Sequence, residues 1–457
     1  MRSLPLASPD QQAHVSFVRT TPYLRAALLL GSGGGFALAC VLTLAPLLRI
    51  PVGPWWAALV QTHGHLQLFG WAGLFVFGVA FSFLPRLRGR PLAWPALLSW
   101  LLGVLVLSLI LRYISQPLLI ATGWFLWDIM LVLSGVLEAL ALPAILMILV
   151  RTTVGKSTTK SVLEGVRSIA PFIFAAFLGL ALSGILNLLN CVAALTHGGL
   201  VPATGDKVSI TLGLFGFLVP VALATSTRML PLYAHLQPFP TRLLWVLTLG
   251  YFAGLICWLL SLLLAGMLSA HGLGLLLMGI AMLLFIGYFL HLMRNRTQLP
   301  PSVAMHAPHP EVLAERAKRR RQEERRRYGP YVALICTAYL WGTLGALLLV
   351  IDGIALLLFG VLPLAIDAIR HSFAVGFITL LICGIAVRLV PGFSSKMIRS
   401  PQLVTATLVL GNAAALLRVG PILLAPVLPA SAFFFALSGP VGLALILCLT
   451  LNLWSAL

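Results

Sequence analysis

The chain is a series of long apolar runs separated by short polar segments, and no other feature of the sequence constrains its fold as strongly. An α-helix needs about 20 apolar residues to cross a bilayer, and twelve of the runs approach or exceed that length. Only 9% of the residues are charged, whereas a soluble domain has about 25%. We therefore predict an all-α polytopic membrane protein. Its expected spans lie near residues 24–48, 57–85, 93–112, 126–150, 169–195, 208–232, 242–266, 271–293, 329–351, 367–391, 402–426 and 431–456.

Lysine and arginine collect in alternate loops of the predicted bundle. They follow the second, fourth, eighth and tenth spans, and the densest stretch is ERAKRRRQEERRR at 315–327. Cytoplasmic loops carry an excess of these residues, so we expect a multi-pass protein of the plasma membrane, the inner membrane of a bacterium, with both termini cytoplasmic. The net charge of +19 then indicates contact with anionic headgroups of the lipid bilayer and not nucleic-acid binding.

A glycine and a proline stand fifteen residues apart in the second, sixth and tenth spans. A regular recurrence of this kind indicates internal repeats, and we predict three pseudo-equivalent repeats of four helices each. The glycine and proline pairs are Gly70 and Pro85, Gly216 and Pro231, and Gly376 and Pro391. The expected segments are a cytoplasmic tail at 1–23, membrane repeats at 24–150, 151–293 and 329–457, and a basic cytoplasmic loop at 294–328.

Two histidines, His63 and His65, lie near the start of the second span. Ionisable side chains inside a membrane are costly, which makes them candidates for a functional site. Residues two apart on an α-helix point about 200° apart around its axis, so the two imidazoles should reach different partners. Five residues before each repeat glycine stand His65, Thr211 and His371, so two of the three predicted repeats carry histidine at the same position.

Neutral imidazole is the usual axial ligand of haem iron and a common ligand of copper. We therefore predict that His63, His65 and His371 bind a cofactor metal. Bis-histidine haem needs imidazoles from two facing helices, and His65 with His371 is the natural pair, which leaves His63 for a second cofactor. Arg370, the neighbour of His371, is the expected partner of a haem propionate.

The segment HGHLQLFG at 63–70 resembles the HAHEMLFG segment of the NnrS family. The segment TRMLP at 227–231 looks like the family's Gly-Arg-x-x-Pro segment, and 371–388 with 410–418 look like its His-x-x-x-x-Gly and Asn-x-x-Ala-Leu-x-Arg helices. The resemblance implies a twelve-span membrane protein that binds haem, with or without copper. It also implies a role in nitric oxide or nitrosative stress, through gas binding, electron transfer or protection of other metal centres.

The same segment is similar to the His-x-His helix of haem-copper oxidases and nitric oxide reductases. That similarity implies a fold like oxidase subunit I, with three pseudo-equivalent arcs of helices. The sequence departs from both patterns. Leu66 stands where the NnrS family has glutamate, and the paired histidines and His-x-x-x-Tyr of the oxidase copper site are not found. The oxidase His-x-His also lies in the tenth span, so a functioning oxidase subunit is disfavoured.

A few other polar residues fall inside the predicted spans. Glu138 is the most deeply placed acid, either a proton acceptor, the partner of an arginine, or hydrogen-bonded to a neighbouring helix. Asp128 and Asp367 lie near outer helix ends and should reach haem propionates only through arginine or water. We expect the side chains of Asn187 and Asn190 to form hydrogen bonds between helices.

Two apolar features have structural interpretations. The Gly-rich patch GSGGG at 31–35 should let a neighbouring backbone approach closely. The apolar stretch at 351–366 is either a half-helix or part of the ninth span. The six cysteines form no Cys-x-x-Cys pair, so neither a disulfide framework nor a thiolate metal site is expected.

Two other functions remain open from the sequence. Twelve spans with helices interrupted by glycine and proline suit a transporter without a redox cofactor, although transporters usually show two related halves and this repeat is threefold. A haem-copper oxidoreductase subunit is the second alternative. The sequence assigns no catalytic residue, and enzymatic activity is left undecided.

Overall fold

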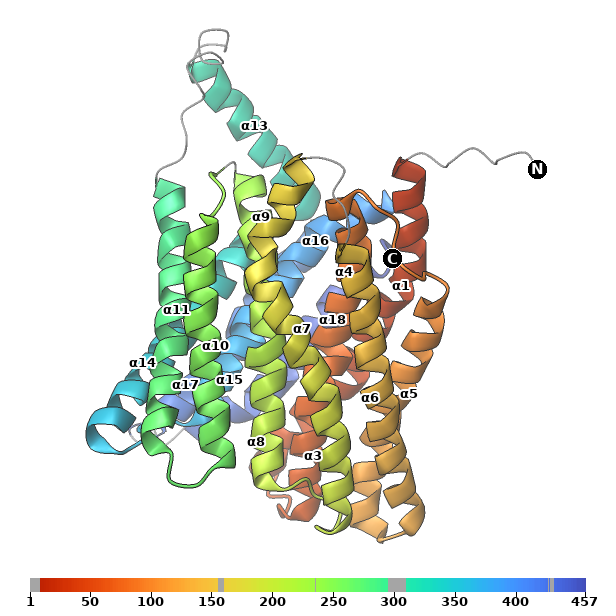
Figure 1. Cartoon of the computed structure of the whole chain (residues 1–457), viewed down its shortest axis with the longest axis vertical. Helices are drawn as coiled ribbons and strands as arrows, with labels where there is room; N and C mark the ends of the chain where they lie inside the picture. Colours follow the sequence, from red (N-terminus) through yellow and green to blue (C-terminus); the bar gives the residue numbers. More distant parts are fainter. Residues whose placement is uncertain (1–8, 155–159, 235, 295–309, 426, 428–430) are drawn as a thin grey trace, which may run out of the picture.

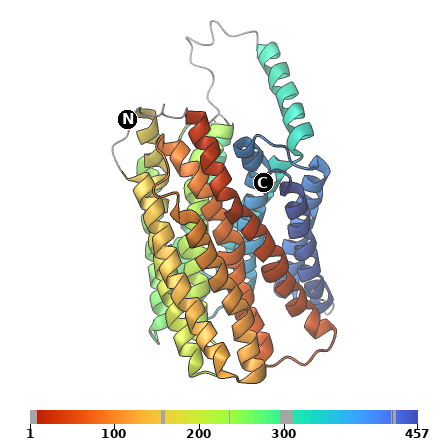
Figure 2. The same ribbon diagram turned by 90° about the vertical axis from the view of Figure 1, so that its right-hand side faces the viewer.

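The structure is a computed structural model that describes residues 9–154, 160–234, 236–294, 310–425, 427 and 431–457. The described residues form helices, with no strand among them. Twelve helices are long and apolar enough to cross a membrane, which confirms the predicted polytopic architecture. Figures 1 and 2 show an elongated bundle whose helices run along its long axis, with α13 (Pro310–Tyr328) projecting from the end that also holds the start of α1 and the C-terminus.

Several spans consist of more than one helical element. The first comprises α1 (Pro9–Leu30), η1 (Gly31–Phe36) and α2 (Ala37–Leu47); the second α3 (Pro54–His65), η2 (Leu66–Gly73) and α4 (Leu74–Arg88); the sixth α8 (Ala203–Thr211), η3 (Leu212–Leu218) and α9 (Val219–Ala234); and the tenth α15 (Ile366–His371), η4 (Ser372–Thr379) and α16 (Leu380–Ser394). The others are α5 (Leu97–Thr122), α6 (Phe125–Thr153), α7 (Lys160–Leu195), α10 (Thr241–Leu263), α11 (Leu268–Arg294), α14 (Tyr331–Phe359), α17 (Pro401–Leu424) and α18 (Ser431–Leu453).

Some boundaries differ from the predicted ones. α5 continues to Thr122, ten residues beyond the predicted end of the third span, because its polar residues face other helices and do not end it. α14 extends to Phe359 and so takes in most of the stretch at 351–366. Residues 9–23 of the predicted polar tail belong to α1.

The second, sixth and tenth spans form the centre of the bundle. Their most apolar stretches are 78%, 83% and 78% buried, against 28–56% for the other nine spans. The outer helices close around them, because α6 packs along α7, α11 along α14, and α18 along α2. The inner spans also touch one another: Trp71 donates to Thr379, and the Phe77–Phe217 and Phe215–Phe373 ring pairs bring the sixth span against the second and the tenth.

Each inner span is α-helical at both ends and π-helical in between, in η2, η3 and η4. The π-helical segments start four residues before Gly70, Gly216 and Gly376. The residues that directly precede them are therefore His65, Thr211 and His371, the three positions that the sequence aligns. π-Helical segments are rare and are frequently found at functional sites.

The Gly-rich patch forms η1, which packs against η2. A Cβ atom on Gly34 would lie 3.0 Å from the Leu66 side chain, and one on Gly35 would lie 2.9 Å from Gln67. Only glycine leaves room for this approach, so the predicted role of the patch is confirmed. It brings the backbone of the first span next to His63.

Candidate functional site

The two histidines of the second span point to opposite sides of their helix, as the spacing predicts. The Nδ1 atom of His63 lies 2.8 Å from the carbonyl oxygen of Gly35 in η1. The Nε2 atom of His65 lies 2.8 Å from Oε2 of Glu138 in α6. The two side chains therefore belong to two separate clusters of polar residues.

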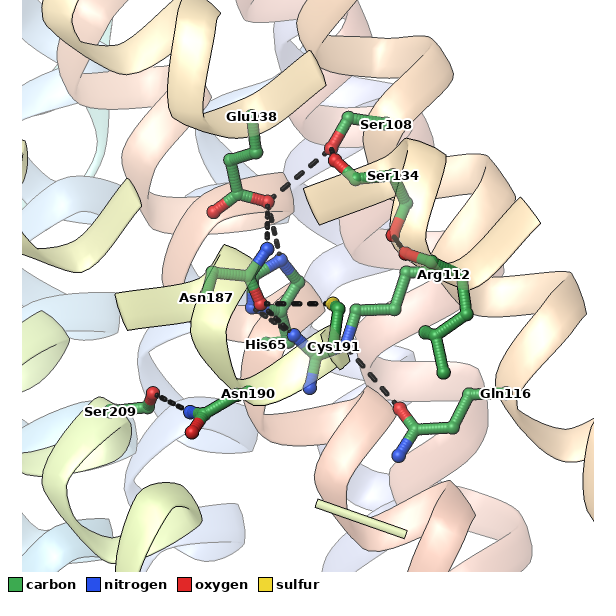
Figure 3. A network of polar contacts seen from close by, with 11 residues as sticks. His65, Ser108, Arg112, Gln116, Ser134, Glu138, Asn187, Asn190, Cys191 and Ser209 are labelled. Atoms are coloured by element: carbon green, nitrogen blue, oxygen red, sulfur yellow. Dashed lines mark hydrogen bonds and ion pairs between the residues drawn. The ribbon is translucent and has the colours of Figure 1, made fainter. Parts of the chain in front are cut away.

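The first cluster, here called the His65 network, lies between α3, α5, α6 and α7 and is drawn in Figure 3. Arg112 Nη1 lies 3.4 Å from Nδ1 of His65. Because a guanidinium can only donate, Nδ1 must accept, and the proton of the neutral imidazole lies on Nε2. His65 therefore donates to the Glu138 carboxylate. Both side chains are deeply buried, with His65 8% exposed and Glu138 fully enclosed.

Glu138 receives all its hydrogen bonds on one oxygen. Asn187 donates to Oε2 at 3.1 Å and Ser108 at 3.4 Å, in addition to His65. The other oxygen, Oε1, is buried and has no hydrogen-bond partner in the described part of the chain. Arg112 donates to Oδ1 of Asn187 and not to Glu138 itself. The interhelical role predicted for Asn187 is thus confirmed. Of the alternatives that the sequence leaves open for Glu138, the hydrogen bond to neighbouring helices is present.

The His65 network continues to the loop that follows α7. Arg112 Nε donates to Oε1 of Gln116 at 3.3 Å, and Gln116 donates to Gln61 at 2.7 Å. Gln61 in turn exchanges two hydrogen bonds with the backbone of Val201, at 2.8 and 3.0 Å. This loop lies at the end of the bundle opposite α13 (Figure 1). A chain of polar groups therefore joins that end to the middle of α6.

The second cluster, here called the His371 cluster, lies between α15 and α17. Nδ1 of His371 lies 2.9 Å from the backbone oxygen of Asp367 and 3.0 Å from its Oδ1. Arg418 donates to Oδ2 of the same carboxylate at 2.7 Å, and its guanidinium lies 4.4 Å from the Phe435 ring centre. Asp367 thus orients His371 and neutralises Arg418.

His63 is the histidine of the second span that lies near this cluster. It is close enough to His371, Asp367 and Arg418 for their charges to act on it, whereas the charges that act on His65 are those of Glu138 and Arg112. The pairing of His65 with His371 stays a prediction, and this geometry favours His63 as the partner, since His65 faces the other side of the helix.

Arg370 lies close enough to Asp206 in α8 and to Asp367 for both negative charges to act on it. Its Nε atom is buried without a hydrogen-bond partner among the described residues, and the same is true of Nε in Arg418. Two guanidinium groups with unused donors therefore stand beside His371. Asn190, the other predicted interhelical asparagine, donates to Ser209 at 2.7 Å and to the backbone of Gly205 at 3.1 Å, which ties α7 to α8.

Sequence reasoning missed Arg112, Gln116 and Arg418 as site residues. The predicted third span ends at Arg112, where a charged side chain is ordinary, but α5 continues for nearly three turns beyond it. A signal was present, because the residues after Arg112 remain largely apolar up to Thr122. Arg418 appeared only as part of a family motif, and its ion pair with Asp367 needs the fold.

An apolar cavity lies between the inner spans, in the half of each span that is C-terminal to the histidine positions. Its volume is about 1050 Å³ with the open side included, and Thr225 is the single polar side chain in its lining among the described residues. The lining comes from α4, η3, α9, η4 and α16, with α6 and α7 closing one side. It includes Val76, Ala80, Val221, Ala222 and Ile385. The histidines do not line this cavity.

Within the described residues, no three side chains of His, Cys, Asp or Glu are grouped so as to hold a metal ion. The six cysteines are all free. No model of a known protein family matches the chain, and no curated protein matches it.

Proposed function

We propose that this protein is an NnrS-like haem protein of the plasma membrane that acts in the nitric oxide or nitrosative stress response, or in related respiratory gas and electron chemistry. One observation carries the proposal. His63 and His371 come from two inner spans, each is fixed through Nδ1 by a carbonyl or carboxylate oxygen, and each keeps its Nε2 atom without a hydrogen bond to any described residue.

This arrangement fits the donor set of a bis-histidine haem. An imidazole that binds a metal usually donates its other N–H to a carbonyl or carboxylate, which fixes the tautomer and the ring orientation. Gly35 and Asp367 supply those acceptors here. Arg370 and Arg418 have unused Nε donors and would hold the propionates. When bound, the haem would supply an iron that exchanges electrons or binds a small gas.

Copper is proposed with less support than haem. A copper site usually needs imidazole or thiolate ligands in addition to one pair of histidines, and the described residues offer no group of three metal-binding side chains. Copper therefore rests on the family resemblance alone.

The proposal includes a fold of three related four-helix units like that of oxidase subunit I. Each unit would contribute one inner span and three outer helices. The π-helical segments support this, because they begin at the same distance from the repeat glycine in all three inner spans. The closed ring of outer helices supports it as well.

The proposed gas ligand agrees with the apolar cavity. A cavity lined almost entirely by hydrocarbon favours small apolar molecules such as nitric oxide over charged solutes. We also propose that the end bearing α13 and the C-terminus is cytoplasmic, since α13 is rich in arginine and cytoplasmic segments carry such an excess.

The optical spectrum and metal content of the full-length protein, purified from haem-replete cells, test the proposal. We expect a low-spin haem spectrum that is lost in His63→Ala and in His371→Ala. His197→Ala, a change in an exposed histidine of the loop after α7, should keep it. His65→Ala should also keep it if His63 is the ligand; loss in His65→Ala alone would restore the pairing predicted from sequence. A colourless, metal-free protein would refute the haem proposal and favour a transporter.

A further inference from the structure

We propose that the apolar cavity between the inner spans holds one acyl chain of an anionic phospholipid, whose phosphate group binds Arg228 and Arg388. The inference is independent of haem, because the lining of this cavity, among the described residues, contains no histidine. The lipid comes from the leaflet at the end of the bundle that bears α13.

The cavity is elongated along the inner spans. Its lining runs from Phe75 to Leu84 in the second span and from Ile378 to Leu389 in the tenth. At a rise of about 1.5 Å per residue, these stretches measure about 14 and 17 Å. The hydrocarbon core of a bilayer is about 30 Å thick, so the cavity is as long as one leaflet of acyl chains is deep. A molecule the size of water takes up only about 30 Å³, whereas an acyl chain fills the length of the cavity.

One side of α4 is incompletely covered by protein. Val76, Val79, Ala80 and Phe83 line the cavity and keep part of their surface exposed, although α4 belongs to an inner span. Their spacing of three and four residues places them in one row along the helix, here called the α4 stripe. Unfilled space forfeits the dispersion contacts of a densely packed interior. An acyl chain restores these contacts and can leave again for the bilayer, since lipid chains are as apolar as leucine.

Arginine stands at the α13 end of the cavity on all three inner spans (Figure 1). Each arginine follows a lining residue of its own span by three or four positions, which places the two on the same side of the helix. The pairs are Leu84 and Arg88, Ala224 and Arg228, and Ile385 and Arg388. Residues 81–94, 221–234 and 381–394 contain no aspartate or glutamate. Basic pockets of this kind between membrane helices bind anionic lipid headgroups.

Two of these arginines are placed to meet a headgroup. Arg228 and Arg388 remain partly exposed, whereas Arg88 is 3% exposed. The guanidinium of Arg388 lies 4.8 Å from the centre of the Tyr328 ring, and its Nε atom has no hydrogen-bond partner among the described residues. A guanidinium binds a phosphate through two parallel hydrogen bonds. The two arginines therefore favour a lipid with a net negative charge over a neutral one.

Photocrosslinking of the full-length protein in nanodiscs tests the proposal with no need for bound haem. The probes are phosphatidylglycerol and phosphatidylcholine with the same acyl chain, each with a diazirine near the middle of that chain, and mass spectrometry maps the labelled residues. We expect phosphatidylglycerol to label the α4 stripe, and both lipids to label Leu140, which is 65% exposed on α6. The ratio of the two labels corrects for lipids that only gather around the protein. An unlabelled α4 stripe, or an equal ratio with both lipids, would overturn the proposal.

Two pairs of variants test the chain and the headgroup separately. Ala80→Phe places a ring in the cavity and should lower the label on the rest of the α4 stripe several-fold, whereas Ala253→Phe, the same change at an exposed position of α10, should not. Arg228→Gln should reduce the preference for phosphatidylglycerol several-fold. Arg294→Gln, which removes one charge at an exposed position at the end of α11, should leave it unchanged. Equal effects within either pair would contradict the assigned site, and the wild-type map decides the proposal even if a variant does not fold.

Discussion

At the scale of single residues, the positions of His63 and His65 show how far the sequence can be read. Their spacing predicts two different environments, and the structure has them, with Gly35 on one side and Glu138 on the other. The identity of the partners was out of reach, because it depends on how helices distant in sequence pack. The sequence identifies Glu138 as a deeply placed acid, but not as the partner of His65.

Arg112 holds the network together without touching Glu138. It donates to Asn187, Gln116 and His65. Asn187 and His65 also contact the Glu138 carboxylate, so Arg112 is the cation that shares partners with this buried acid. We expect Arg112→Leu to destabilise the protein by about 3 kcal/mol, since it leaves Glu138 charged without a nearby cation. The measurement is the thermal unfolding midpoint in detergent at a fixed scan rate.

A double variant makes this prediction specific to charge. Adding Glu138→Gln to Arg112→Leu removes the uncompensated carboxylate. The double variant should therefore lose clearly less stability than the two single variants lose when their losses are added. Arg319→Leu, which removes an exposed ion pair with Glu315 on α13, should change the midpoint little. Strict additivity of the two network variants would show that Arg112 acts by packing alone.

At the scale of elements, glycine sets how closely the helices approach. Cβ atoms built on Gly254 and Gly274 would each lie under 3.0 Å from backbone of the facing helix, which ties α10 to α11. Gly279 and Gly353 do the same between α11 and α14. Small residues at such contacts allow the close backbone packing that holds membrane helices together. The repeat glycines are readable from sequence, whereas the π-helical segments they belong to are not, because these depend on local tertiary packing.

Gly376 is the repeat glycine with the least room, because a Cβ atom there would lie 2.5 Å from Cβ of Trp341 in α14. Gly376→Ala should therefore cost about 1–3 kcal/mol through overpacking. Gly103 faces open space in α5, so Gly103→Ala should be neutral or stabilising by up to about 1 kcal/mol from helix propensity. Thermal unfolding of the two variants compares one substitution in two surroundings, and equal shifts would contradict the packing argument.

At the scale of the whole molecule, the number of spans followed directly from hydrophobicity, and the twelve predicted helices are present. Their arrangement did not follow in the same way. The sequence marked the second, sixth and tenth spans by their shared spacing, but that these spans form the centre is visible only from their burial. The sequence of an apolar helix does not show whether lipid or protein surrounds it. For the same reason, the apolar cavity between the inner helices cannot be predicted from the sequence.

The cavity gives the last prediction, because it belongs to no single helix. A dry apolar cavity of sufficient size binds xenon, so xenon NMR of the wild-type protein in nanodiscs should show an exchanging bound population. Ala222→Phe places a ring into the space between α9 and its neighbours and should abolish that signal. Leu140→Phe enlarges a side chain on the lipid-facing side of α6 and should leave it unchanged. Xenon binding that survives Ala222→Phe would place the bound gas in the surrounding lipid, and the cavity would then have no role in taking up a small apolar ligand.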